Sequence, residues 1–336
     1  MSQDIQITTN LTPNIIMHIF SCLEIEGSSY HSKYGLKNRF TLLKDDYEKW
    51  EKIEKKCIML NCSEELFAIF YQIPSYIPSD SIETIIDCFE ILEECIQTKT
   101  IEPLVETYPG IFENLEIYAP IEAYNTYFQT LHTHEDIIIE IIDDYKQLLI
   151  KLWDRFYREY WENNAKPRIN KKIKDLEVIV KPVNIIKSWQ KVFDIPFPYE
   201  EFIVYLVEPT STIATNLIAE KIVVALEKEE LDFYKILIHE IGRSFLLTTN
   251  MMKSEPLEKI AISNMDKLSL IIDAAIIYLK RSLYKTFHLR SDDHDPYMVQ
   301  GLDEIINTFE EIWENNKQKD IYEVLAKTYN KLSPIV

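Results

Sequence analysis

The scarcity of glycine is the feature that most constrains the fold of this chain. Only five of its 336 residues are glycine, whereas an average protein contains about 7 %. A backbone that approaches a phosphate group closely needs clustered glycines, so the sequence excludes a P-loop or a dinucleotide-binding fold. Tight hairpin turns also favour glycine. We therefore expect a chain made mostly of helices.

The charge balance narrows the possible partners. The chain has 36 basic and 55 acidic residues, which gives a net charge of −19 with the histidines neutral. An acidic surface repels phosphate groups, so we expect neither a nucleic-acid partner nor binding to an anionic membrane. No apolar run approaches the ~20 residues that a membrane-spanning helix needs. We expect the partner to be a protein or a peptide.

The N-terminus and the cysteines indicate a cytoplasmic protein. The first ten residues, MSQDIQITTN, lack the basic and apolar regions of a signal peptide. The five cysteines are odd in number, include no CxxC pair and lie mostly in apolar, helix-like surroundings. We therefore expect reduced core thiols, which are typical of a reducing compartment.

The apolar pattern predicts long helices and a region of short strands. Apolar residues follow the 3.6-residue period from Asp136 to Glu162, which predicts a central core helix. Segments rich in β-branched residues predict strands at 176–180 (LEVIV), 202–207 (FIVYLV) and 221–226 (KIVVAL). Further helices are predicted at 184–193, 266–287, 298–314 and 320–331. Ser263 with Asp266, and Asp320 with Glu323, resemble helix N-caps.

A change in composition after Asn163 predicts the domain boundary. We expect a helical N-terminal region over residues 1–165. The predicted strands then belong to a second domain over residues 166–336. The expected fold class is α+β, mostly helical, with a small sheet beside the helix at 231–248.

The segment 231–248, LDFYKILIHEIGRSFLLT, carries the most distinctive chemistry. It is predicted to be a buried helix with His239, Glu240 and Arg243 on neighbouring turns. Zinc peptidases carry HExxH on such a helix, because two imidazoles four residues apart bind the metal and the glutamate activates its water. Here Arg243 stands where the second histidine would be. A guanidinium has no lone pair to offer a metal.

This motif, HEIGRSF, resembles the HEFGHSF-type signature of a bacterial branch of the gluzincin-type zinc metallopeptidases. Strands, then the motif helix, then a helix with an acidic residue follow the same order as in that clan. The resemblance implies a zincin-like domain with His239 as a metal ligand and Glu240 as the general base. It also implies an acidic ligand on the next helix, for which Asp273 and Asp266 are the candidates.

The departure from the motif at Arg243 favours a protein that has lost catalysis. We expect a catalytically impaired metallopeptidase-like protein that binds a protein or peptide through the former substrate cleft, without a cofactor. A first alternative is an active zinc-dependent peptidase, in which His239, Asp273 and an unidentified group hold the metal and Glu240 activates water. A second is an all-helical adaptor protein, in which the motif is coincidental.

The resemblance also predicts where a partner binds. In peptidases of this kind an edge strand holds the substrate by main-chain hydrogen bonds. We therefore predict that the strand at 221–226 lies at the edge of the cleft. The predicted partner-binding residues are Lys221, Ile222, Val223 and Val224.

A further prediction concerns what replaces the metal. Arg243 lies one helical turn after His239, so its guanidinium can reach the volume that a zinc ion would occupy. We expect Glu240 and Asp273 to line that volume and Arg243 to tie the two helices together. Four other histidines could supply a missing ligand but are interpreted as surface residues: His132, His134, His288 and His294.

Overall fold

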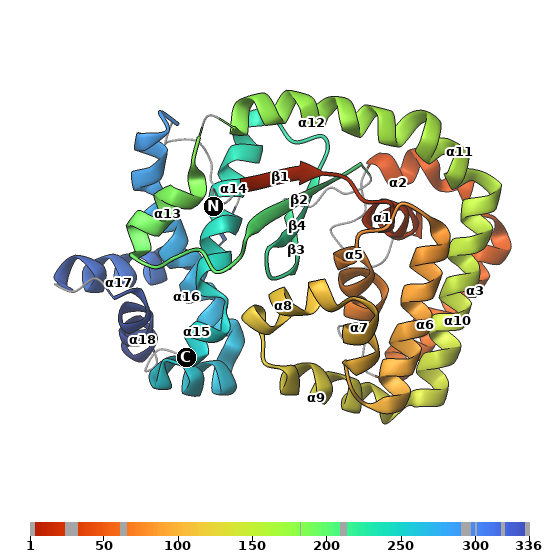
Figure 1. Cartoon of the computed structure of the whole chain (residues 1–336), viewed down its shortest axis with the longest axis horizontal. Coiled ribbons are helices and arrows are strands. Elements are labelled where there is room, and N and C mark those ends of the chain that lie inside the picture. Colours follow the sequence, from red (N-terminus) through yellow and green to blue (C-terminus); the bar gives the residue numbers. More distant parts are fainter. Residues whose placement is uncertain are drawn as a thin grey trace. The chain divides into compact units, whose positions relative to one another are not determined.

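The chain divides into two compact units in the computed structural model, whose elements are labelled in Figure 1. The structure describes residues 4–23, 33–60, 66–181, 183–208, 214–289, 297–299, 301–316 and 320–332. Unit 1 comprises Met1–Ile5, Val178–Phe202 and Glu229–Val336. Unit 2 comprises Gln6–Glu177 and Ile203–Lys228. The predicted boundary after residue 165 does not coincide with this division, because a helical run continues through it.

Unit 2 is built mainly from helices. These are α1 (Leu11–Leu23), α2 (Lys33–Asn38), η1 (Arg39–Thr41), α3 (Lys44–Leu60), η2 (Ala68–Gln72), α5 (Ile73–Tyr76), α6 (Ile82–Thr98), α7 (Glu102–Thr107), α8 (Pro109–Tyr118) and α9 (Ile121–His132). The predicted long helix is present as α10 (Glu135–Leu152). It continues through η3 (Trp153–Tyr157), α11 (Arg158–Tyr160), η4 (Trp161–Ala165) and α12 (Lys166–Val180). The segments η2, η3 and η4 are π-helical.

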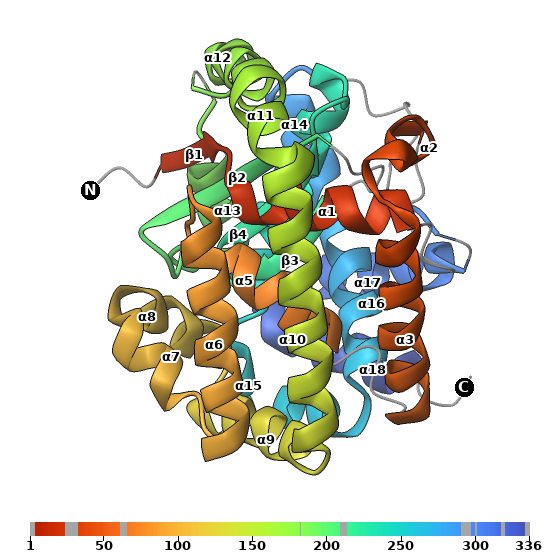
Figure 2. The ribbon, with the colours of Figure 1, turned by 90° about the vertical axis from the view of Figure 1, so that its right-hand side faces the viewer.

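Helix α10 forms the centre of the unit 2 core and lies between α6 and α3 (Figure 2). Its buried stripe consists of Ile138, Ile141, Ile142, Tyr145, Leu148, Leu149 and Leu152. The Tyr145 ring lies 4.6 Å from that of Phe70 and 5.7 Å from that of Phe89, measured between centroids. Burying one large apolar side chain stabilises a fold by roughly 1.5–3 kcal/mol. The stripe therefore anchors the helices around it.

A small mixed sheet of four strands confirms the α+β prediction. The strand order is β1 (Asp4–Thr8), β2 (Glu201–Val207), β4 (Lys221–Ala225) and β3 (Ala214–Ile218). β2 runs parallel to β4, and β3 runs antiparallel to β4. The predicted strands at 202–207 and 221–226 are confirmed. Because these strands precede residue 231, the protein is not all-helical.

The predicted strand at 176–180 is wrong, since these residues form the end of α12. Leu176 and Val180 are buried, whereas Val178 between them is 73 % exposed. In a strand all three side chains would share one face, but in a helix residues four apart share a face and the middle one points away. The buried Ile169 earlier in α12 continues the same helical stripe.

Strand β4 is not an edge strand, contrary to prediction. β2 pairs with one side of it and β3 with the other, so neither side is open to a partner peptide. The sequence analysis missed β3, whose polar residues gave no strand pattern. The side chains of the proposed docking residues are also buried: Lys221, Ile222, Val223 and Val224. Main-chain docking along these four residues therefore has no structural basis.

Unit 1 consists of helices that follow the predicted ones closely. They are α13 (Ile185–Phe193), α14 (Glu230–Leu246), α15 (Thr249–Met252), α16 (Glu255–Thr286), α17 (Leu302–Asn315) and α18 (Ile321–Leu332). The Oδ1 atom of Asp320 accepts from the main-chain N of Tyr322 at 2.9 Å, which confirms the predicted cap of α18. None of the helices in the described ranges is both long enough and apolar enough to cross a membrane.

Helix α16 starts earlier than predicted and is interrupted at Asn264. This residue has φ −162° and ψ 77°, and its Oδ1 atom accepts from the main-chain N of Lys267 at 3.0 Å. Asn264 therefore caps the second part of α16 in place of Ser263, whose side chain lies outside the described residues. Cys22, Cys88 and Cys95 are buried thiols, as expected, whereas Cys57 is only half-buried and Cys62 lies outside the described residues. Burial raises the pKa of Cys22 to about 12.

Candidate functional site

Helix α14 carries the HEIGR motif within unit 1. Its acidic first turn and the basic Arg243 in its last turn both suit the helix dipole. On the α13 side, Nε1 of Trp189 donates to the main-chain O of Ile238 at 2.7 Å. A Cβ atom on Gly242 would lie only 2.9 Å from the Trp189 ring. The glycine of the motif therefore allows α13 and α14 to pack closely.

Three of the predicted site residues meet at one carboxylate. The Oδ1 atom of Asp273, on α16, lies 3.3 Å from Nε2 of His239 and 3.1 Å from Nε of Arg243. Nη2 of Arg243 also donates to Oγ of Ser269 at 3.2 Å. The other acidic candidate, Asp266, is exposed. Asp273 is therefore the acidic residue that α16 brings to the motif helix.

A buried lysine lies on the other side of the imidazole. Nζ of Lys280 is 3.2 Å from Nδ1 of His239, and neither residue is exposed to solvent. Sequence reasoning missed Lys280. It lies seven residues after Asp273, and this spacing places both on the same face of α16. That periodicity was the signal that could have found it.

Tyr297 covers the motif from a third segment. Its ring stacks on the His239 imidazole, with centroids 3.5 Å apart and planes 6° from parallel. Its hydroxyl donates to Oε1 of Glu240 at 2.6 Å. Glu240 is 2 % exposed, and its Oε2 atom has no hydrogen-bond partner among the described residues. No sequence pattern pointed to Tyr297, because it lies outside the helices. We call these six residues the His239 site: His239, Glu240, Arg243, Asp273, Lys280 and Tyr297.

Burial and neighbouring charges set the proton affinities in the His239 site. Burial raises the pKa of the Asp273 carboxyl, and the cations of Arg243 and Lys280 oppose this rise. Burial, together with the Glu240 carboxylate, raises the pKa of the Tyr297 phenol well above 10. The phenol therefore stays protonated at neutral pH and acts as the donor to Glu240.

The arrangement is a network of opposite charges around one imidazole. Arg243 and Lys280 provide two cations, and Asp273 and Glu240 provide two carboxyl groups. Within the described part of the chain, no three His, Cys, Asp or Glu residues gather in a group that could hold a metal ion. Chemically, the network can link α14 to α16 by charge-assisted hydrogen bonds.

Of the four histidines considered as further ligands, the three that the structure describes do not join this site. His132 belongs to unit 2, where its Nδ1 atom lies 3.1 Å from the main-chain O of Ile96 and 3.0 Å from Oε2 of Glu135. His134 and His288 are exposed, as expected for surface residues. His294 lies outside the described residues.

Unit 1 also contains a groove of about 580 Å³ between α13, α16 and α17. Its residues are Lys191, Val192, Tyr278, Leu279, Arg281, Ser282, Lys285, Glu310, Trp313 and Glu314. Three of them are basic, and two are acidic. Ligand sites have volumes of about 300–1,000 Å³, so this groove has the size of a binding site.

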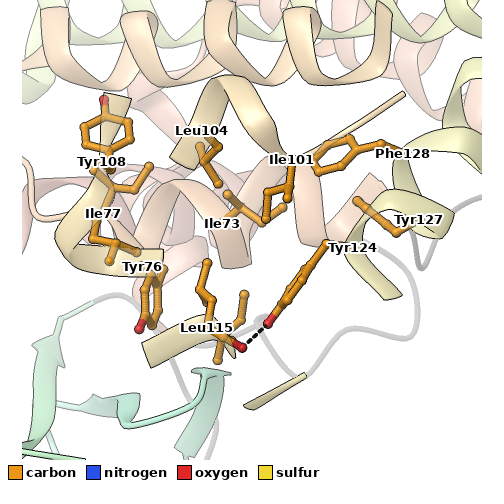
Figure 3. A pocket seen from close by; sticks show the side chains of 12 residues that line it. Ile73, Tyr76, Ile77, Ile101, Leu104, Tyr108, Leu115, Tyr124, Tyr127 and Phe128 are labelled. Atoms are coloured by element: carbon orange, nitrogen blue, oxygen red, sulfur yellow. Dashed lines mark hydrogen bonds between the residues drawn. The ribbon is translucent and has the colours of Figure 1, made fainter. Parts of the chain in front are cut away.

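A much smaller cavity, of about 20 Å³, lies within unit 2 (Figure 3). Tyr76, Tyr108, Tyr124 and Phe128 are among the apolar and aromatic side chains around it. The Tyr124 hydroxyl donates to the main-chain O of Leu115 at 3.0 Å. A space of this size holds about one water molecule. We interpret it as a packing void.

Comparison with known proteins finds no relative of this chain. No protein-family model, no curated protein and no solved structure matches the chain.

Proposed function

We propose that this chain is a catalytically impaired, metallopeptidase-like protein that binds a protein or peptide partner. The observation that carries the proposal is the shared Asp273 oxygen, which lies within 3.3 Å of both His239 and Arg243. In a zinc peptidase of the resembled clan, a metal ion would link the motif helix to the acidic residue. Here a guanidinium makes that link.

The chemistry of Arg243 argues against catalysis by a bound metal. A guanidinium stays protonated in proteins, so it repels a cation at any physiological pH. Lys280 on the other imidazole nitrogen adds a second positive group. Tyr297 stacks on the face of the ring. A metal at His239 would have to displace or tolerate all three neighbours.

The alternative remains an active zinc-dependent peptidase with altered ligands. In that case His239 and Asp273 would hold the ion, and Glu240 would activate the water. No observation specific to this chain favours it over the impaired form. The zinc experiment below distinguishes the two, because only the active form needs a stoichiometric metal.

For the partner, we propose the groove between α13, α16 and α17. Its basic side, with Arg281 and Lys285, suits a peptide carboxylate, and its acidic side, with Glu310 and Glu314, suits a peptide cation. Tyr278 and Trp313 add aromatic rings to the lining. Mixed charges of this kind match a peptide better than a nucleic acid, whose charge has one sign. We propose that binding takes place in the cytoplasm.

The test is zinc binding measured by elemental analysis after exposure to zinc and dialysis. We expect the wild type to retain no stoichiometric zinc. Arg243→His restores two imidazoles four residues apart and should gain zinc that the second change His239→Ala removes. Arg281→His places a new histidine on exposed α16 and serves as the control.

Wild-type protein that holds one zinc per chain, and loses it on His239→Ala, would replace the proposal by the active alternative. A mixture of casein peptides tests the partner function separately. We expect the peptides that the wild-type protein retains to stay intact. The Arg281→Glu variant should retain less peptide than the wild type. Hydrolysis of the peptides that depends on Glu240 would contradict the proposed loss of catalysis. Equal retention by the wild type and by Arg281→Glu would refute the groove as the binding site.

A further inference from the structure

The groove between α13, α16 and α17 takes its positive and its negative groups from different helices. Its three cations, Lys191, Arg281 and Lys285, belong to α13 and α16, whereas both of its carboxylates, Glu310 and Glu314, belong to α17. Residues four apart lie on one helix face, so Arg281 and Lys285 share a face of α16, and Glu310 and Glu314 share a face of α17. The groove therefore has a basic wall and an acidic wall.

The charges of the two walls do not compensate each other. Within the described part of the chain, none of the five charged side chains of the groove forms an ion pair. All are exposed except Glu310, which is half-buried. By contrast, Glu311, the residue after Glu310, pairs with Lys331 at 2.6 Å. Opposite charges that line one groove without pairing can instead bind the charges of a ligand.

Tyr278 shows how close the two walls are. Cζ of Arg281 lies 6.0 Å from the centre of the Tyr278 ring, and the Tyr278 hydroxyl donates to Oε1 of Glu314 at 2.9 Å. One tyrosine side chain thus extends from the positive group to the negative one. A ligand that bridges the walls must carry opposite charges about one side-chain length apart.

The helices that carry the two walls are packed on a common core. Ala274 and Ile277 of α16 pack with Leu302 and Ile306 of α17 in one buried cluster, and Tyr278 packs against this cluster. The backbone behind the charged side chains is therefore fixed before a ligand arrives. Such preorganisation lowers the entropy that binding costs.

We propose that the groove binds the C-terminal residue of a partner peptide, and that this residue is lysine or arginine. Its α-carboxylate suits the basic wall, where Arg281 can bind a carboxylate through two parallel hydrogen bonds. Its side-chain cation suits Glu310 and Glu314 on the acidic wall. The two charges of such a residue are one side chain apart, as the groove requires. This inference rests on the proposed function, because it names the partner of the groove described there.

A chain end suits this groove better than an internal segment does. An internal segment has a neutral main chain, so it would have to supply both charges from two flexible side chains, each of which loses rotamer freedom on binding. A C-terminal residue carries its carboxylate on the main chain and needs only one ordered side chain. A phosphate group alone would leave the acidic wall without a partner.

The test measures the binding of labelled peptides to the full chain by fluorescence anisotropy. The probe is a short alanine peptide that ends in lysine with a free carboxylate and carries fluorescein at its N-terminus. Amidation of the C-terminus removes only the carboxylate and should raise Kd about tenfold or more, since hydrogen bonds between charged groups are the strong ones. Replacing the terminal lysine by alanine should also raise Kd.

Two variants assign these preferences to the two walls. Arg281→Glu should raise Kd for the free-acid probe and abolish the difference between the free acid and the amide. Glu310→Lys should shift the preference from a terminal lysine to a terminal glutamate. A variant that merely disturbs the fold would weaken the binding of both peptides alike, so the reversal is specific to a charge contact.

Matched controls change the same charges outside the groove. Lys187→Glu alters an exposed cation of α13 one turn before Lys191, and Glu304→Lys alters an exposed acid of α17. Neither residue lines the groove. Each control changes the net charge as much as its test variant does, and both should leave Kd and the peptide preference unchanged.

The failure of this inference can be distinguished from the failure of the proposed function. Equal Kd for the free acid and the amide, together with retention of casein peptides that depends on Arg281, would overturn the chain end and leave the groove as the binding site. Equally tight binding of a peptide with internal glutamate and lysine and both ends blocked would do the same. No binding of any peptide would overturn both.

Discussion

Replacing Arg243 by alanine tests the network that links α14 to α16. The side chain of Arg243 is 21 % exposed and that of Asp273 is 24 % exposed. The pair is therefore less accessible than an ordinary surface ion pair but not fully buried. Arg243→Ala would also remove the hydrogen bond to Ser269.

The expected loss of stability lies between two known limits. Exposed ion pairs contribute about 0–1 kcal/mol, and breaking a buried pair costs about 3–5 kcal/mol. In the Arg243→Ala variant, Asp273 would keep its contact with His239 and its electrostatic attraction to Lys280. We therefore expect Arg243→Ala to lower the free energy of unfolding by about 2 kcal/mol at neutral pH.

The loss should depend on pH in a definite direction. Burial raises the folded-state pKa of Asp273 above its ordinary 3.8. The folded state therefore gains free energy of unfolding from the protonated carboxyl. This gain is fully present below the ordinary pKa and is lost as pH rises through the folded-state pKa. Arg243 opposes the rise, so Arg243→Ala should push the folded pKa higher still. The destabilisation should therefore grow from pH 4 to pH 7 and be smallest in acid.

Urea unfolding followed by tryptophan fluorescence provides the assay. Trp189 donates to the α14 backbone and so reports on this helix. Arg281→Ala on the exposed side of α16 is the control and should change stability by less than about 0.5 kcal/mol. If Arg243→Ala behaves like this control at pH 7, the reasoning about the linking cation is refuted.

Three further changes test other contacts. Tyr297→Phe removes the donor to Glu240 and leaves a buried carboxylate oxygen unpaired, so circular dichroism melting should show a loss of about 1–3 kcal/mol. Gly242→Ala forces a methyl group to 2.9 Å from Trp189, and chemical denaturation should show a loss of about 1–3 kcal/mol. Ala219→Gly relieves a positive φ of 57°, so the urea midpoint should rise by the equivalent of about 1 kcal/mol.

Two of these changes, Tyr297→Phe and Gly242→Ala, have a comparison within the chain. Tyr278→Phe also removes one hydrogen bond, to Glu314, but at an exposed position where water replaces it, so it should have little effect. Gly110→Ala on α8 meets nothing within 4 Å and should stabilise the chain by about 0.5–1 kcal/mol. If Gly242→Ala stabilises as Gly110→Ala does, α13 and α14 are not packed as closely as described.

Most helices could be predicted because apolar periodicity and helix caps are signals within a short stretch of sequence. The apolar stripe of α10 and the Asp320 cap of α18 can each be recognised within a few residues. The segment 176–180 failed because β-branched residues favour strands only as a weak preference. Here the continuing stripe from Ile169 outweighed it. β3 was missed because its residues show no strand pattern by themselves. It forms a strand through its pairing with β4, which is a tertiary contact.

The His239 site was predictable along the helices and unpredictable elsewhere. The spacing of four residues between His239 and Arg243 places both on one face of α14. Asp273 was predicted as an acidic residue on the helix that follows. Tyr297 approaches from an irregular segment, so no period relates it to the motif. The interior position of β4 could not be foreseen either, since it depends on strand order.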